Sequence, residues 1–375
     1  IIDIVDDTHS FFQNEEAKKK INGLINYIEN KAEKIQKQVT LLELLIFKPT
    51  KWLVLNGNIL PKQSGNCKKK VLSLLKKKQL TMSKIDPNKL LISSDFYSIQ
   101  GEGRFMGVPS VFLRVFGCNF KCEGFGMPKG ECSTERDEVK VELYNKYEDL
   151  PLVNTGCDSY ASWDPRFKAL SPTYDTSKVI DKMLALTPNN RWVQDNGNDV
   201  HLVITGGEPL LGWQRAYEEL LSHPRMADLK NITFETNGTQ KLHDRFKTFL
   251  EQWQQPALGG KQERFVTFSV SAKLSASGEK WDDAICPDIV CDYQTYGHTY
   301  LKFVVATEDD LAEAEKAVAA YREAGFKGPV YLMPVGGVES VYALNNRKVA
   351  ELAMKKGWRY SDRLQVPLFK NEWGT

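Results

Sequence analysis

The sequence has no long apolar run and no excess of either charge. Its 375 residues include 50 Lys and Arg against 48 Asp and Glu, so the formal net charge is +2. A charge this close to balance gives no field that would favour nucleic acid. The most apolar stretch, Leu41 to Phe47, is far shorter than the about 18 residues of a membrane span, and it contains Glu43. We therefore expect a soluble chain with neither nucleic acid nor a membrane as partner.

The beginning of the chain, IIDIVDDTHSF, lacks the basic start and the small-residue cleavage site of a secretory signal. We therefore expect a cytoplasmic protein, in which the seven cysteines are in a reducing compartment where disulfides are rare. Cysteines in that setting indicate a metal site, redox chemistry or simple burial.

The composition changes near Met82. Before it the sequence is rich in Lys, Asn, Gln and Ile, with lysine triplets at 18–20, 68–70 and 76–78. We predict a helical, Lys-rich extension over residues 1–81, either a basic segment that binds a partner or a poorly packed one that is not part of the native enzyme. The segment TMSKIDPNKLL resembles a natural start, which makes Met82 the expected initiator and 82–375 the functional domain.

After Met82, short β-branched and aromatic runs alternate with amphipathic helical stretches such as TSKVIDKMLAL and EDDLAEAEKAVAAYREAG. This alternation predicts an α/β fold with βαβ units and a parallel sheet. About six such units are fewer than the eight of a closed TIM barrel, so we expect a partial, open TIM-type barrel. The predicted strands are 110–116, 200–206, 231–238, 264–271, 300–306 and 329–335.

Chemically distinctive residues follow four of these strands in turn. Cys118 follows the first strand, and the motifs GGEP, ETNG and SAK follow the next three. Active sites of such folds lie at the carboxyl ends of the strands. We therefore expect these residues to meet at one site.

The cysteine-rich segment VFGCNFKCEGFGMPKGECSTER favours a metal centre. A site with three thiolates leaves one position open, and an iron–sulfur cluster held by three cysteines has one iron free for a substrate. Cys118, Cys122 and one further cysteine fit that pattern. A structural zinc held by these two with Cys132 and Cys157 stays open as an alternative, although the paired Cys-x2-Cys of a zinc ribbon is missing. The other cysteines are predicted to be ordinary buried or surface residues: Cys67, Cys286 and Cys291.

Six motifs occur in one order from Asp95 to the end of the chain: FYSIQGEGRFMGVPSVFLRVFGCNFKC, CDSYASW, VITGGEPLL, TFETNGT, SVSAK and RLQVPLFKNEWG. Together they resemble 7-carboxy-7-deazaguanine synthases of the radical S-adenosylmethionine superfamily. The most specific element is the combination of YSIQGEG, Cys-x3-Cys and GGEP, since GGEP alone is a common turn. The resemblance covers the chain after Met82 and implies a radical S-adenosylmethionine core.

The chain departs from that family in its cysteine loop. The family pattern is Cys-x3-Cys-x2-Cys-Asp-Thr, whereas here Cys-Asp-Ser appears only at Cys157, as if an insertion at about 123–155 followed Cys122. The resemblance therefore implies Cys157 as the third ligand of a [4Fe–4S] cluster, with Cys132 as the rival. The insertion itself is either a lid over the site or an inert surface excursion, and the sequence does not decide between the two.

The resemblance also implies a site for S-adenosylmethionine. Glu208 has an alternative interpretation as a charge at a helix N-terminus. Ala272 stands where the family has proline, which adds an N–H without removing the contacts of its neighbours. The implied cofactor-binding residues are Gly156, Asp158, Gly206, Gly207, Glu208, Ser271, Ala272 and Lys273.

The family substrate is 6-carboxy-5,6,7,8-tetrahydropterin, a flat ring with amide-like edges and a carboxylate. Such a molecule needs hydrogen-bonding partners along its edge and a planar cation at the carboxylate. A simple turn for QGEG and a surface-facing strand position for Arg114 are the alternatives. The implied substrate-binding residues are Ile99, Gln100, Gly101, Glu102, Arg114 and Thr205.

A magnesium ion is implied beside the pterin, held in part by Ser159, which replaces the family threonine and keeps its hydroxyl. The alternative is that Ser159 caps a helix. Phe369 stands where the family has histidine, so an imidazole contact to the substrate is lost.

The resemblance implies an electron donor such as flavodoxin or ferredoxin, and a homodimer is the commonest default for an oligomer. Two other functions stay open: another radical enzyme of the superfamily, such as a glycyl-radical activase, and a zinc-stabilised binding module without catalysis. The sequence does not indicate whether the product serves tRNA, DNA modification or a secondary metabolite.

Overall fold

The computed structural model describes residues 52–55, 58–61, 89–255 and 263–375. The chain divides into two units, Ile1–Asp86 and Pro87–Thr375. In the first unit, β1 (Trp52–Leu55) and β2 (Asn58–Pro61) pair as antiparallel strands. The helices predicted for residues 1–81, and Cys67, lie outside the described residues.

The second unit is built on a nine-stranded sheet with the order β11-β10-β9-β8-β7-β6-β4-β3-β5. From β4 to β11 each strand runs parallel to its neighbour. The six predicted strands are confirmed with small shifts at their ends. They are β4 (Pro109–Val115), β6 (His201–Gly206), β7 (Asn231–Thr236), β8 (Phe265–Val270), β9 (His298–Val305) and β10 (Val330–Pro334).

Three strands of this sheet were not predicted: β3 (Lys89–Ile99), β5 (Thr173–Asp175) and β11 (Arg359–Tyr360). The long β3 runs antiparallel to both β4 and β5. Its alternation of apolar residues is broken by the buried Ser93 and Ser94, where the register with β4 shifts. Since β5 and β11 end the sheet without pairing to each other, the barrel is open, as predicted.

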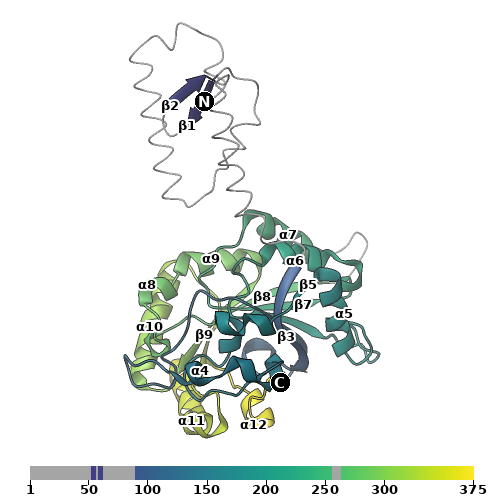
Figure 1. Cartoon of the computed structure of the whole chain (residues 1–375). Coiled ribbons are helices and arrows are strands. Elements are labelled where there is room, and N and C mark those ends of the chain that lie inside the picture. The colour runs from purple at the N-terminus through teal and green to yellow at the C-terminus, as the bar shows by residue number, and fades with distance from the viewer. Residues whose placement is uncertain (1–51, 56–57, 62–88, 256–262) are drawn as a thin grey trace, which may run out of the picture. The chain divides into compact units, whose positions relative to one another are not determined.

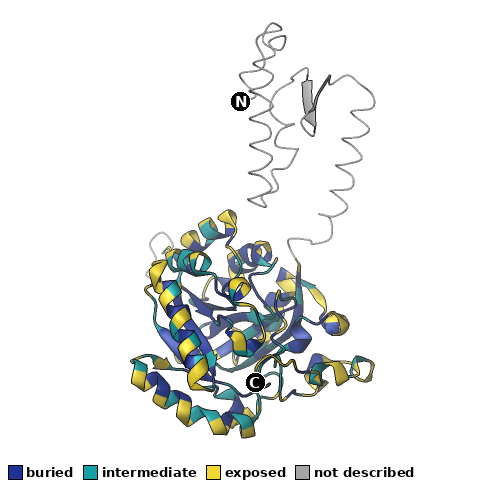
Figure 2. Cartoon of the chain, turned by 90° about the vertical axis from the view of Figure 1, so that its left-hand side faces the viewer, coloured by how far each residue is buried: buried dark blue, intermediate teal, exposed yellow. Residues whose placement is uncertain are grey.

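Helices surround the sheet and close the apolar core between them (Figure 1). Figure 2 shows their exposed outer faces and the buried strands inside. Amphipathic helices of this kind bury one stripe and leave the opposite face in solvent. The described α-helices of this unit are α4 (Glu135–Glu138), α5 (Thr176–Leu186), α6 (Gln214–Ser222), α7 (Asp244–Gln254), α8 (Trp281–Ala284), α9 (Pro287–Tyr296), α10 (Glu308–Glu323), α11 (Glu339–Lys356) and α12 (Gln365–Phe369).

The helical stretches TSKVIDKMLAL and EDDLAEAEKAVAAYREAG are confirmed as α5 and α10. The start of α10 shows why such a stretch begins where it does. The Thr307 hydroxyl accepts from the Asp310 amide, and the Asp310 carboxylate accepts from the Thr307 amide, which forms a capping box. Among the described residues, no helix is long and apolar enough to cross a membrane.

The insertion at 123–155 holds α4 and two short 3-10 helices, Val141–Leu143 and Tyr147–Asp149. It has a small apolar core of its own, in which Tyr147, Leu150 and Val153 pack with residues of 160–167. Trp373 packs against this cluster and donates a hydrogen bond to the Leu150 carbonyl, at 2.7 Å. The insertion is therefore a packed structure that contacts the end of the chain.

Candidate active site

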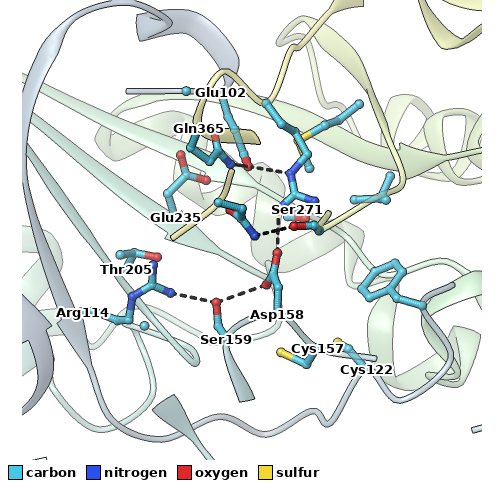
Figure 3. Close-up of a pocket in the computed structure, with 18 of the residues that line it drawn as sticks. Glu102, Arg114, Cys122, Cys157, Asp158, Ser159, Thr205, Glu235, Ser271 and Gln365 are labelled. Atoms are coloured by element: carbon cyan, nitrogen blue, oxygen red, sulfur yellow. Dashed lines mark hydrogen bonds and ion pairs between the residues drawn. The ribbon is translucent and has the colours of Figure 1, made fainter. Parts of the chain in front are cut away.

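A cavity of about 280 Å³ opens at the carboxyl ends of the parallel strands. Figure 3 shows side chains from β4, β6 and β7, and from the cysteine segments, pointing toward it. The sequence had placed the site at this edge because the carboxyl ends of parallel strands lie together. The predicted residues that line it are Ile99, Gln100, Gly101, Glu102, Arg114, Cys118, Cys122, Gly156, Cys157, Asp158, Ser159, Thr205, Gly206, Gly207, Ser271 and Lys273.

Three cysteines meet at one end of the cavity. Cys118 and Cys157 pack against a buried cluster that contains Cys122, whereas Cys132 is exposed and lies outside the cavity lining. The Cys118 sulfur accepts a hydrogen bond from the Phe120 amide at 3.4 Å, and the Cys157 sulfur accepts one from Trp163 Nε1 at 3.3 Å. Sulfurs that accept N–H bonds suit thiolate ligands of a cluster.

Burial raises the pKa of these thiols, that of Cys118 to about 12. A bound metal reverses this preference, since its charge deprotonates a coordinating thiol. In the part of the chain that the structure describes, no three His, Cys, Asp or Glu side chains converge as ligands of a single metal ion. A cluster of several atoms does not need ligands that converge on one point, so the three cysteines still fit an iron–sulfur group.

The loop that carries Cys122 is held by Glu279, which sequence reasoning missed. Cys122 has a φ of 52°, in the left-handed region that side chains rarely adopt. One oxygen of Glu279 accepts from the amides of both Lys121 and Cys122, each at 2.8 Å. These bonds stabilise the strained backbone and keep the Cys122 thiol at the cavity.

The two glycines of the GGEP motif lie against the backbone of the neighbouring segment. A Cβ on Gly206 would overlap the Val115 carbonyl, and one on Gly207 would overlap the Gly117 carbonyl. The two glycines thus allow the end of β6 to approach the backbone that leads to Cys118. That contact orients the cysteine loop, whatever else the glycines bind.

Glu208 is fully buried and is not in the cavity lining. Its carboxylate accepts from the Leu210 amide at 2.9 Å, the Thr236 hydroxyl at 2.8 Å and the Asn237 amide at 2.7 Å. Burial raises its pKa to about 7, although the bonds from Asn237 and Leu210 oppose the shift. In this structure Glu208 joins the turn after β6 to the end of β7.

The QGEG segment forms the turn between β3 and β4 and also lines the cavity. The Gln100 amide donates to the Val108 carbonyl at 2.8 Å, which closes the turn. A Cβ on Gly101 would overlap the side-chain amide of Gln365, so glycine is needed for this close approach. The turn interpretation is therefore right for the backbone, and the side chains of Gln100 and Glu102 still face the site.

A network of charges lines the cavity, in which Lys302 is buried and Asp158 is 42% exposed. Lys302 is 2% exposed and contacts Glu102 at 2.5 Å and Glu235 at 3.1 Å. Arg363 contacts Glu102 at 3.3 Å and Asp158 at 2.6 Å. Burial alone lowers the pKa of Lys302, but the two carboxylates raise it overall. The network fixes the charge of each member, because neutralising one would leave its partners buried and unpaired.

Arg114 and Ser159 line another part of the cavity and contact each other (Figure 3). Arg114 Nη1 donates to the Ser159 hydroxyl at 2.8 Å, and that hydroxyl donates to Asp158 at 3.2 Å. Ser159 makes no side-chain capping bond to the short helix that follows it, Tyr160–Ser162, so the capping alternative does not hold. Arg114 Nε is buried and has no hydrogen-bond partner among the described residues.

The SAK motif places Ser271 and Lys273 in the cavity wall, with Lys273 Nζ donating to Ser271 Oγ at 3.1 Å. Ala272 is buried between them and does not line the cavity. Phe369 lies in α12, partly exposed and away from the cavity lining.

Sequence reasoning assigned no role to Glu235, Lys302, Arg363 and Gln365, which all line the cavity. Lys302 had a signal, since a lysine inside the apolar run YLKFVV needs a buried partner. Glu235 stood in the ETNG motif at the right strand end. Arg363 and Gln365 lie in the motif RLQVPLFKNEWG, but nothing in that motif indicated their partners, which lie more than 200 positions earlier in the chain.

Comparisons with known proteins confirm the resemblance. The chain is 29% identical over 298 residues to the 7-carboxy-7-deazaguanine synthase of Halobacterium salinarum, covering 75% of this chain and 91% of that protein. It is also 29% identical to those of Pyrobaculum aerophilum, with 74% and 94% covered, and Rhodopirellula baltica, with 76% and 89% covered.

No family model matches the chain. The crystal structure of QueE from Escherichia coli aligns with a TM-score of 0.41 and 17% identity, covering 73% of this chain and 93% of that one.

Proposed function

We propose that this chain, which is similar in sequence to 7-carboxy-7-deazaguanine synthases, is itself a radical S-adenosylmethionine enzyme that converts 6-carboxy-5,6,7,8-tetrahydropterin to 7-carboxy-7-deazaguanine with loss of ammonia. One observation carries the proposal. A single cavity brings Cys118, Cys122 and Cys157 together with Gln100 and Arg114. A zinc module has no use for Gln100 and Arg114, and an activase acting on a protein backbone does not require an arginine in the cavity wall.

The types of residue that line the cavity suit an iron–sulfur cluster and S-adenosylmethionine. The three cysteines would hold a [4Fe–4S] cluster and leave one iron open, and Ser271 and Lys273 would contact S-adenosylmethionine. When bound, the cluster would supply the electron that cleaves this cofactor and starts the radical reaction. The electron would come from a donor such as flavodoxin or ferredoxin.

The chain's own residues would bind and orient the pterin. Gln100 and Glu102 offer an amide and a carboxylate to the ring edge, and the guanidinium of Arg114 would donate hydrogen bonds to the substrate carboxylate. Ser159, between Arg114 and Asp158, offers a hydroxyl oxygen to a magnesium ion, which commonly keeps several waters. Lys302 and Arg363 would hold Glu102 in position at the ring edge.

Anaerobic assay tests the proposal. Protein purified and reconstituted without oxygen should be brown, and should turn over the pterin in the presence of S-adenosylmethionine, magnesium and a reductant. Cleavage of S-adenosylmethionine without pterin turnover would indicate a different radical enzyme. A colourless protein that binds zinc would overturn the proposal altogether.

A further inference from the structure

We propose that Arg136, in the insertion, is a positioning residue that holds together the two separated parts of the cysteine motif. The first part ends at Cys122 and the second begins at Cys157. The inference rests on the proposed function for its consequence, a stable cluster. The placement of the Cys122 and Cys157 thiols relative to each other can be tested in the absence of a cluster.

The two ends of the insertion lie next to each other. The Gly156 amide donates to the Phe125 carbonyl at 2.7 Å, so the residue before Cys157 is bonded to the residue three positions after Cys122. The Ser133 amide donates to the Glu123 carbonyl at 2.8 Å, which brings the middle of the insertion to the same place. The chain between these points is long, and closing a long loop costs conformational entropy that a short Cys-x2-Cys spacing does not.

Arg136 lies between the two parts. Its Nη2 contacts Glu123 at 2.9 Å, next to Cys122, and its Nε contacts Asp164 at 3.2 Å. Its guanidinium stacks over the ring of Trp163, 4.9 Å from the centroid. Trp163 is the residue whose indole N–H donates to the Cys157 sulfur. One side chain therefore connects the neighbour of one thiol to the hydrogen-bond donor of another.

The remaining bonds of α4 hold Arg136 in that position. Glu135 accepts from the Asn154 amide at 2.6 Å and from the Thr155 hydroxyl at 2.7 Å, and these residues lead into Cys157. The Arg136 side chain is only 15% exposed. A planar guanidinium with several donors can contact two carboxylates and an aromatic face at once, which a lysine ammonium cannot.

Arg166 is a matched control. It shares the Asp164 carboxylate, at 2.8 Å, and its other polar partners are Asp137 and the backbone of Arg136 and Asp137. Its removal therefore takes a similar charge from the same cluster while the contacts to Glu123 and Trp163 remain.

The first test measures thiol placement in the cluster-free, full-length chain. A short bifunctional thiol reagent should join Cys122 to Cys157, with the joined peptides identified by mass spectrometry. We expect Arg136→Met to slow this cross-link about tenfold, as loss of roughly 1.4 kcal/mol of positioning would do, and Arg166→Met to change it less than about twofold. Equal effects of the two variants would overturn the proposal.

The second test measures iron retention after anaerobic reconstitution. Under challenge with a chelator, Arg136→Met should lose iron about tenfold faster than the parent protein, and Arg166→Met should not. The unfolding temperatures of the two variants should agree within a few degrees. A large drop confined to Arg136→Met would assign Arg136 to general stability and overturn the proposal.

Glu123→Gln is the second variant, for the case in which Arg136→Met does not fold. It weakens the same contact from the side of Cys122 and should also slow the cross-link. A normal cross-link rate in Glu123→Gln would overturn the proposal. If the cross-link behaves as expected but no iron is bound, the positioning role stands and the proposed function fails.

Discussion

The guanidinium of Arg363 donates a hydrogen bond to the carboxylate of Asp158, with 2.6 Å between Nη2 and Oδ2. Asp158 follows Cys157 directly, whereas Arg363 stands just before the last helix, α12. Arg363 also contacts Glu102, so it ties the segment of the third cysteine to the turn predicted to bind the pterin. The cysteine end of the cavity and the end lined by Gln100 and Glu102 are therefore joined through Arg363.

Cys157 is predicted to be the third cluster ligand. Because Cys157 lines the cavity and Cys132 is exposed outside it, Cys157→Ala should abolish the iron bound after reconstitution, and Cys132→Ala should leave it near the parent level. Iron analysis and visible absorbance check this. The reverse pattern would make Cys132 the ligand.

Arg114 is predicted to bind the substrate carboxylate. Arg114→Lys should raise the KM for the pterin about tenfold or more, because an ammonium cannot make the two-pronged contact of a guanidinium. Cleavage of S-adenosylmethionine should change little. Steady-state assays of both reactions provide the measurement, and equal losses in the two would assign Arg114 to the cofactor or to folding.

Ser159 is predicted to be a magnesium ligand. Ser159→Ala should lower turnover and shift the magnesium requirement upward, while Ser159→Thr should stay close to normal because it keeps the hydroxyl. Turnover titrated with magnesium separates the possibilities. An unchanged magnesium dependence in Ser159→Ala would leave the hydroxyl only its bonds to Arg114 and Asp158.

The charge of Glu102 predicts a pH dependence of stability. Burial raises its pKa, but Lys302 and Arg363 outweigh burial and bring the pKa down from 4.5 to about 2. A depressed carboxyl pKa contributes stability that is present above the unfolded value and is lost as pH falls from about 4.5 toward about 2. For Glu102 this contribution is about 3 kcal/mol at pH 7 and about 1 kcal/mol at pH 3.

Glu102→Gln removes this dependence. Chemical denaturation of the cluster-free chain at pH 6 and pH 3 should show a smaller loss of unfolding free energy in the variant than in the parent protein. Glu148→Gln, at an exposed position, is the control and should follow the parent. If Glu102→Gln and the parent lose stability equally, the Glu102 carboxylate is not held by its cationic partners.

The lysine-rich extension is predicted to be dispensable. A shortened chain that begins at Met82 should fold, bind iron and turn over substrate like the full chain, since the described residues that line the cavity all belong to the second unit, Pro87–Thr375. Iron content and turnover of the two chains are compared. A large loss in the shortened chain would make the extension part of the enzyme.

Local sequence patterns are sufficient to predict the main sheet and the edge at which the cavity lies. Runs such as VHLVITG and amphipathic stretches such as TSKVIDKMLAL have a local period that reports burial on one face, so β6 and α5 could be placed within a few residues. Since consecutive parallel strands end at the same edge, residues that follow them, including Cys118 and Ser271, were predicted to meet. The β3 strand was missed because buried serines break its apolar alternation.

Only the tertiary structure decided which distant residues complete the site. The contacts of Arg363 with Asp158 and of Lys302 with Glu102 join positions about 200 apart, and no local period or propensity encodes such pairs. The same holds for Cys157, which reaches Cys122 because an insertion with its own apolar core turns back and bonds to Phe125. Local patterns report the environment of each element, whereas the partners of a buried charge or thiol depend on how separate elements pack.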